Sequence, residues 1–321
     1  MSSIMHRSVD SNGIRMHVAE QGIGPLVVLL HGFPECWYSW RHQLSALADA
    51  GYRAVAPDQR GFGRTDRPEN LESYTVLHTV GDVIGLLDAL EEDRAVVVGH
   101  DFGSRPAWGA AIMRPDRIRG VVGLSVPFVP RGPLPPIGGL RSTLGERFYQ
   151  VYFQEPGRAE TEFERDVRTT IRKIMYGLSG DVPEVPTPIV PEGGELLDIF
   201  DDPEVLPDWL NEEDVDVYAR EFDRTGFASA LSWVRNFDRN WELLAPWMGA
   251  KVEVPALYMA GEKDHVVRFP GMPELIANLE TFVPGLNRTV MLRGCGHWTQ
   301  QERADEVTAA LIRFIKDLPD A

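Results

Sequence analysis

The chain has 321 residues, of which 43% are hydrophobic and 25% are charged, so it is typical of a globular protein with one large domain or a core with an insert. Its 48 acidic and 32 basic residues give a net charge of −16, which argues against nucleic acids and anionic membranes as partners. The N-terminal segment lacks the apolar stretch of a signal peptide. Two cysteines, Cys36 and Cys295, are too few for a disulfide framework, so we expect free thiols in the cytoplasm.

The first 130 residues predict alternating strands and helices. Strand-like segments around a turn indicate a hairpin over residues 4–19, and further strands are expected over 25–30, 52–63, 94–101 and 118–127. Helical spacing predicts helices over 40–51 and 76–92. The unbroken apolar run at 26–30 is typical of a strand that is buried on both faces. This order predicts an α/β protein with a doubly wound, mostly parallel sheet.

The pattern changes after Pro127. Five prolines fall within residues 127–136, and helices are predicted over 145–154, 158–178 and 211–226, with an acidic, proline-rich loop over 181–209. Strand signals return at 254–261 and 289–296, and an amphipathic helix is predicted over 304–318. We therefore expect a core made of residues 1–130 and 246–321, with a helical cap inserted at 131–245.

Three chemically capable residues follow predicted strands, in the order nucleophile, acid and base. Asp101 is the middle residue of a glycine-x-nucleophile-x-glycine turn, Asp264 follows the strand at 254–261, and His297 follows the strand at 289–296. The carboxyl ends of parallel strands lie at one edge of a sheet, where active sites form. The order and placement favour a catalytic triad over three unrelated structural residues.

An aspartate nucleophile indicates attack on saturated carbon. Such an attack forms an ester whose carbonyl water can cleave, whereas a serine would form an ether that water at neutral pH does not cleave. Asp101 therefore points to epoxides or alkyl halides. His297 would activate the hydrolytic water while Asp264 orients the imidazole. The backbone N–H groups of Phe33 and Phe102 are the candidate donors to the oxyanion.

Five segments of the sequence resemble the soluble epoxide hydrolases of the α/β-hydrolase fold. These segments are HGFPECWYSWRHQ, DQRGFGRTDRP, VVGHDFG, GEKDHVV and GCGHW, and the resemblance covers almost the whole chain. It implies hydrolysis of a small apolar epoxide to a diol, without a metal or cofactor. It also implies that two cap tyrosines, Tyr149 and Tyr218, protonate the epoxide oxygen. Tyr152 competes with Tyr149, and packing is the alternative role for these tyrosines.

The pocket and the assembly are less constrained by the sequence. Trp37, Phe128 and Trp233 suggest an aromatic substrate-binding wall, and we expect a monomer or a homodimer. Phe102 stands where the family usually has tryptophan, and Val234 stands where a WYRN motif would have tyrosine. A haloalkane dehalogenase is one alternative, although Phe33 and Phe102 offer no side-chain donor for a halide. A non-catalytic ligand-binding member of the fold is the other.

Overall fold

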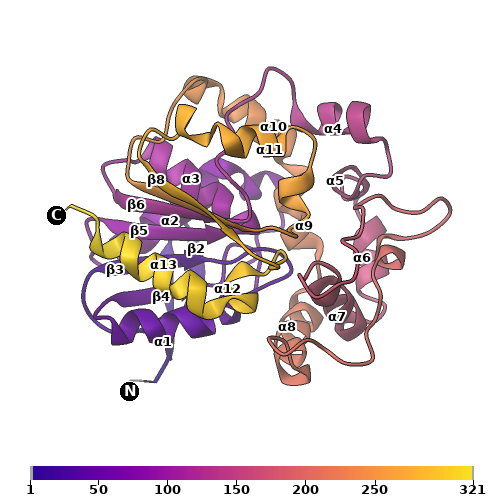
Figure 1. Ribbon diagram of the computed structural model, residues 1–321, viewed down its shortest axis with the longest axis horizontal. Helices are drawn as coiled ribbons and strands as arrows, with labels where there is room; N and C mark the ends of the chain where they lie inside the picture. The colour runs from indigo at the N-terminus through magenta and orange to yellow at the C-terminus, as the bar shows by residue number, and fades with distance from the viewer. Residues whose placement is uncertain (1–2, 320–321) are drawn as a thin grey trace.

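The computed structural model describes residues 3–319, and its strands form one sheet (Figure 1). The sheet has the order β1-β2-β4-β3-β5-β6-β7-β8. The strands are β1 (Met5–Ser11), β2 (Ile14–Gln21), β3 (Leu26–Leu30), β4 (Arg53–Pro57), β5 (Ala95–His100), β6 (Ile118–Leu124), β7 (Ala256–Gly261) and β8 (Leu286–Leu292). Strand β2 runs antiparallel to β1 and β4, and the remaining neighbours are parallel. The predicted hairpin and the mostly parallel α/β sheet are confirmed.

Helices cover both faces of the sheet because successive residues of a buried strand point to opposite sides. Val97 faces the apolar cluster that contains residues of α2 (Val76–Ala89) and α3 (Ser104–Met113). Its neighbours Val96 and Val98 face a second cluster, which contains residues of α1 (Arg41–Asp49) and α13 (Ala304–Lys316). The continuous apolar runs in the sequence thus reflect burial on two faces.

Helices dominate the chain between β6 and β7, and α5 to α8 lie beyond one end of the strands (Figure 1). The α-helices of this segment are α4 (Pro136–Leu144), α5 (Tyr149–Tyr152), α6 (Arg158–Phe163), α7 (Val167–Gly177), α8 (Glu212–Thr225), α9 (Ala228–Arg235) and α10 (Phe237–Leu243). After β7 come α11 (Met272–Ala277) and α12 (Thr299–Glu302). The exact division of the chain at residues 131 and 245 stays a prediction.

Two predicted cap helices differ from the structure. The single helix expected over 158–178 is split into α6 and α7, because the Asp166 side chain accepts a hydrogen bond from the Thr169 N–H and so begins a new helix. The helix expected over 145–154 is reduced to the four residues of α5. Helix α4 begins at Pro136 and was not expected within a proline-rich stretch, although proline is well tolerated in a first helical turn.

The helical insert is bonded directly to the loop that carries His297. The His297 N–H donates to the Leu178 carbonyl at 2.9 Å, and the Trp298 indole donates to the Met175 carbonyl at 2.7 Å. A Cβ atom on Gly296 would lie 2.3 Å from the Gly180 nitrogen, so glycine allows this close approach. The insert therefore helps to fix the loop after β8.

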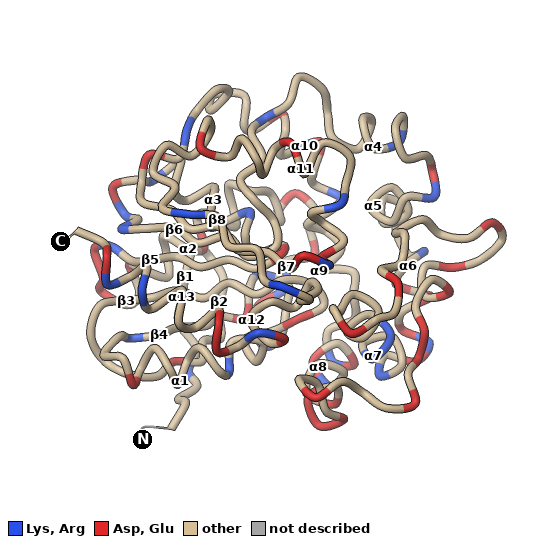
Figure 2. The backbone as a smooth tube through the Cα atoms, viewed as in Figure 1, with Lys and Arg blue, Asp and Glu red and all other residues tan. Residues whose placement is uncertain are grey.

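Acidic residues are spread over the core and the insert, including α8 (Figure 2). Within residues 3–319, none of the helices has both the length and the apolar character needed to cross a membrane.

Candidate active site

Asp101 lies at the tip of a sharp strand-to-helix turn. It follows β5, begins the 3-10 helix η3 (Asp101–Gly103), and has a φ angle of 49°, which is uncommon for a residue other than glycine. A Cβ on Gly99 would lie 2.2 Å from the Gly103 carbonyl oxygen, and one on Gly103 would lie 2.3 Å from the Leu30 carbonyl oxygen. The close backbone approaches explain both glycines of the motif. Ser104 donates to the Gly99 and Leu124 carbonyls, so it is occupied in the core.

The two oxygens of the Asp101 carboxylate have different neighbours. Oδ1 accepts a hydrogen bond of 3.0 Å from the Phe33 N–H, and Oδ2 lies 3.7 Å from His297 Nε2. The Asp101 side chain is 13% exposed, so protein atoms do not enclose it completely. Phe102 stacks on Phe33 with ring centroids 5.7 Å apart, and its N–H forms no hydrogen bond with Asp101. The role of Phe102 as a second oxyanion donor stays a prediction.

His297 and Asp264 form a buried ion pair beside Asp101. His297 Nδ1 donates to Asp264 Oδ1 at 3.0 Å, and Ser125 Oγ lies 3.1 Å from the same nitrogen. Burial opposes the charged form of His297, but the charges of Asp264 and Asp101 outweigh it and raise the His297 pKa to about 9. Burial likewise opposes the charged form of Asp264, and His297 and His265 outweigh it and lower the Asp264 pKa. The structure brings together the three residues predicted as nucleophile, base and acid.

A second buried ion pair, Glu35 and His100, supports the site and was missed in the sequence. His100 Nδ1 lies 2.7 Å from Glu35, and His100 Nε2 donates to the His297 carbonyl at 2.8 Å. Glu35 also accepts from the Gly32 N–H. Burial would raise the pKa of Glu35, but the charge and hydrogen bond of His100 lower it to about 2. This pair links the loop of Phe33 to the loop of His297. The position of His100 directly before the nucleophile was the available signal.

Asp264, His265 and His297 also have atoms spaced closely enough to be considered as metal ligands. Their potential ligand atoms lie within 4.8 Å of one another. The His297–Asp264 hydrogen bond already occupies one nitrogen and one oxygen of this group. The contacts are thus those of a hydrogen-bonded imidazole–carboxylate pair with a neighbouring histidine.

Tyr149 shares the electrostatic environment of Asp101. Burial raises the pKa of Tyr149, and the negative charge of Asp101 raises it further, so the phenol stays protonated. The Tyr149 oxygen accepts a hydrogen bond of 2.8 Å from Gln150, which leaves its own proton available. The competing Tyr152 instead donates to Glu162 at 2.7 Å within the insert.

Tyr218 lies in a different polar network. It is fully buried on α8, and its hydroxyl donates to Gln301 Oε1 at 3.0 Å and lies 3.0 Å from Ser39 Oγ. Gln301 in turn donates to Glu35 at 3.0 Å. The hydroxyl groups of Tyr149 and Tyr218 therefore share no hydrogen-bond partner among residues 3–319. Val234 is buried and apolar, so it adds no donor at its position either.

Two of the three predicted substrate-binding aromatics lie in one cavity. Phe128 and Trp233 line a space of about 100 Å³ together with Arg105, and Trp233 stacks on Phe102 at 6.3 Å. Trp37 lies elsewhere. Its ring contacts His6 and Tyr38, and its backbone N–H donates to the Asp58 side chain. Trp37 therefore does not line this cavity, and its role in substrate binding stays a prediction.

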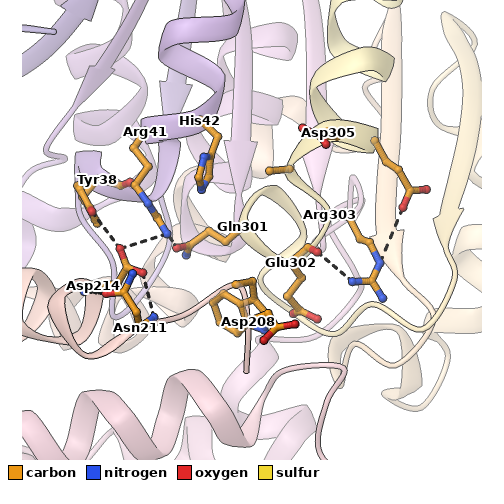
Figure 3. A pocket seen from close by; sticks show the side chains of 13 residues that line it. Tyr38, Arg41, His42, Asp208, Asn211, Asp214, Gln301, Glu302, Arg303 and Asp305 are labelled. Carbon is orange, nitrogen blue, oxygen red and sulfur yellow. Dashed lines mark hydrogen bonds and ion pairs between the residues drawn. The ribbon is translucent and has the colours of Figure 1, made fainter. Parts of the chain in front are cut away.

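A cleft of about 730 Å³ is separate from the triad (Figure 3). It is lined by residues near α1, before and at the start of α8, and on α12 and α13. Asp214 there accepts a hydrogen bond of 2.9 Å from Tyr38 and lies 3.4 Å from Arg41. These paired charges join the insert to the core, and none of Asp101, His297 or Tyr149 lines the cleft.

The comparisons with known proteins agree with this geometry. Residues 25–170 match the family model described as alpha/beta hydrolase fold. The chain is 46% identical to epoxide hydrolase 1 of Siraitia grosvenorii, covering 98% of this chain and 99% of that protein. It is 44% identical to epoxide hydrolase A of Mycobacterium tuberculosis, covering 99% of each chain.

Solved structures give the same result. The crystal structure of an epoxide hydrolase from Vigna radiata has a TM-score of 0.93 and 42% identity, covering 99% of this chain and 100% of that chain. An epoxide hydrolase from an endophytic Streptomyces has a TM-score of 0.94 and 46% identity, covering 98% of this chain and 96% of that chain. These relatives favour neither the dehalogenase nor the non-catalytic alternative. The chain belongs to the epoxide hydrolase family of the α/β-hydrolase fold and is an enzyme that hydrolyses epoxides.

Proposed function

We propose that this enzyme opens epoxides through a covalent ester on Asp101, which water activated by His297 then cleaves. The observation that carries the proposal is the arrangement around the Asp101 carboxylate. The Phe33 N–H binds Oδ1 at 3.0 Å, whereas Oδ2 faces His297 at 3.7 Å without a backbone hydrogen bond. Oδ2 is therefore the oxygen that is available to attack.

In the first step, Oδ2 attacks an epoxide carbon and displaces the ring oxygen. The new C–O bond makes an ester, and the ring oxygen leaves as an alkoxide that remains part of the substrate. Tyr149 supplies a proton to this oxygen, because burial and the negative charge of Asp101 keep its phenol protonated. The alkylated enzyme then carries a neutral ester in place of a carboxylate.

In the second step, water attacks the ester carbonyl carbon, and His297 Nε2 accepts one of its protons. The developing oxyanion lies on Oδ1, where the Phe33 N–H already binds, and the Phe102 N–H is the proposed second donor. Collapse of this intermediate breaks the bond between the carbonyl carbon and the alkyl oxygen. The diol leaves, and Asp101 keeps the oxygen from water.

The raised pKa of His297 accounts for the protons that are exchanged over the two steps. At neutral pH the resting imidazole is protonated, since its pKa is about 9. Ester formation removes the Asp101 charge, so the His297 pKa falls. The His297 imidazolium then releases a proton, and this proton replaces the one that Tyr149 gave to the substrate. His297 is then a neutral base for the water, and the departing alkoxide takes the remaining proton of the regenerated carboxyl group. The cycle returns Asp101, His297 and Tyr149 to their starting states.

We assign Tyr218 a positioning role in place of the proton-donor role predicted from the sequence. Its hydroxyl holds Gln301, Gln301 donates to Glu35, and Glu35 pairs with His100, which donates to the His297 carbonyl. This chain of hydrogen bonds connects α8 to the catalytic loop. Tyr149 is thus the proposed principal acid.

Other expectations remain proposals with indirect support. The aromatic cavity of Phe128 and Trp233 supports an apolar portion of the substrate. Cys36 and Cys295 are buried free thiols, which supports a reducing, cytoplasmic environment. We retain the expectation of a monomer or a homodimer.

The first prediction concerns the coupling of charges. A unit charge about 4 Å away contributes roughly 4 kcal/mol at an effective dielectric constant of 20, equivalent to nearly three pH units before solvent screening. Asp101→Asn removes a negative charge that stabilises the imidazolium, so the His297 pKa should fall by at least about one unit. NMR titration of the imidazole carbons measures it, and an unchanged pKa would contradict the proposed proton balance.

The second prediction concerns the base. His297→Gln should leave alkylation working and block hydrolysis, so intact mass should show protein plus one epoxide after mixing with styrene oxide. Asp264→Asn should slow the same step less completely, because Asp264 orients the base and stabilises its charge. The double variant Asp101→Asn, His297→Gln is the control and should form no adduct. Normal turnover by folded His297→Gln would place the base elsewhere.

The third prediction separates the two tyrosines by reaction step. Tyr149→Phe should slow alkylation by roughly ten- to a thousandfold, the effect of losing one preorganised donor. Tyr218→Phe should slow ester hydrolysis instead, by about tenfold or less, the effect of one neutral hydrogen bond. Stopped-flow tryptophan fluorescence resolves both steps, and circular dichroism checks the fold. If Tyr218→Phe slows alkylation as much as Tyr149→Phe does, both tyrosines are proton donors.

A further inference from the structure

Arg105 lies one helical turn beyond the nucleophile. Helix α3 continues from the η3 turn, so residues 101 and 105 are four positions apart in one helical segment. Arg105 lines a cavity with Trp233, whose ring stacks on Phe102, the residue after the nucleophile, with ring centroids 6.3 Å apart. Burial lowers the pKa of Arg105, and the charges of Asp101 and Tyr149 oppose that effect. The guanidinium is therefore within electrostatic reach of both reacting groups.

Arg105 has no acidic partner. Its guanidinium carbon lies 4.0 Å above the centroid of the Phe237 ring, and it forms no hydrogen bond or ion pair with any residue from 3 to 319. The buried Arg60, by contrast, pairs with Asp82 at 2.5 Å. Arg60 is buried whereas Arg105 is exposed, so the contrast is one of availability: the Arg105 guanidinium has no protein anion beside it and is free to bind an anion that a ligand supplies.

The side chain faces the cavity of about 100 Å³ described above. Arg105 is exposed although its depth is enough to lower its pKa, which fits a side chain that borders an open interior space. Trp108, Phe128 and Trp233 form aromatic walls, and no residue lining this cavity is acidic. The cavity therefore presents one positive charge on an apolar background and has room for a small group.

Asn240 adds a second donor at the same place. Its Oδ1 accepts a hydrogen bond of 2.7 Å from the Val76 N–H, which fixes the orientation of the amide. Its Nδ2 donates to none of the residues in the range 3–319 and lies in the lining of the cavity. Asn240 and Phe237 are three residues apart on α10, so the helix that carries the ring under Arg105 also carries this amide.

We propose that Arg105 and Asn240 bind a carboxylate carried by the epoxide, so that the preferred substrates are epoxides of organic acids. A planar guanidinium matches a carboxylate in a bidentate hydrogen bond, and the amide supplies a further N–H donor. The proposal rests on the proposed function, because the epoxide carbon must reach Asp101 while the acid group reaches Arg105. The overall charge of −16 does not oppose it, since charges farther than about 8 Å are largely screened at physiological salt.

The test compares acids with their own amides. The substrates are styrene oxide with a para-carboxylate, styrene oxide with a para-carboxymethyl group and phenylglycidate, each beside its primary amide, and kcat/KM is measured for all six. The wild-type enzyme should prefer the acid in at least one pair. Arg105→Met should lower that acid-to-amide ratio by about ten- to a hundredfold, the effect of losing a charge-assisted hydrogen bond.

Two further variants sharpen the comparison. Asn240→Asp keeps the acceptor for Val76 and adds a negative charge, so it should also lower the acid-to-amide ratio. Arg131→Met is the matched control: Arg131 stacks on Trp241 at 3.8 Å, but it donates to the Trp241 carbonyl and does not line the cavity. It should leave the ratio unchanged.

A measurement on the wild-type enzyme covers the case in which Arg105→Met does not fold. Phenylacetate should inhibit turnover of styrene oxide competitively and more strongly than phenylacetamide does. The proposal is overturned if amides equal or exceed acids in all three pairs, if folded Arg105→Met lowers both members of a pair equally or neither, or if phenylacetamide is the better inhibitor. Formation of the Asp101 adduct on styrene oxide tests the proposed function independently, because that substrate carries no acid group.

Discussion

The arrangement of the site depends on the negative charge of Asp101. Neighbouring groups stabilise this carboxylate without transferring a proton to it. The Phe33 N–H binds one oxygen, and the His297 imidazolium faces the other from 3.7 Å, beyond a direct hydrogen bond. This separation leaves Oδ2 free for the proposed attack on carbon. With Asp264, the same charge raises the pKa of His297, and with burial it raises the pKa of Tyr149, so in the proposed reaction both groups respond when Asp101 becomes an ester.

Backbone geometry places this charge. The left-handed conformation of Asp101 turns its side chain out of the sheet, and the flanking glycines allow the turn to pack closely. Behind the three site residues, the Glu35–His100 pair connects the loop after β3 to the loop after β8. The helical insert forms hydrogen bonds to both sets of residues. Tyr218 donates to Gln301, which donates to Glu35, and the Leu178 carbonyl accepts from the His297 N–H. The insert thus helps to hold the loop of His297 in place and also carries Tyr149, the proposed acid.

The sheet, the triad and the Phe33 donor were predictable from the sequence because each depends on local pattern. Apolar runs such as residues 26–30 define buried strands, and the glycines around Asp101 define the turn. The role of Tyr218 was not predictable in this way, because the direction of a side chain on α8 depends on how that helix packs on Ser39 and Gln301. The same holds for Trp37, whose ring direction depends on packing against His6 and Tyr38. Arg105 became informative only when the structure showed that it has no acidic partner.

The covalent ester on Asp101 is the central claim, and isotope labelling in a single turnover tests it most directly. Enzyme in excess is mixed with an epoxide in oxygen-18 water, and the diol and the peptide containing Asp101 are analysed by mass spectrometry. Cleavage at the ester carbonyl predicts that the label enters the Asp101 carboxylate and that the first diol is unlabelled. Full labelling of the first diol, with none in Asp101, would show direct attack of water on the epoxide and would contradict the account.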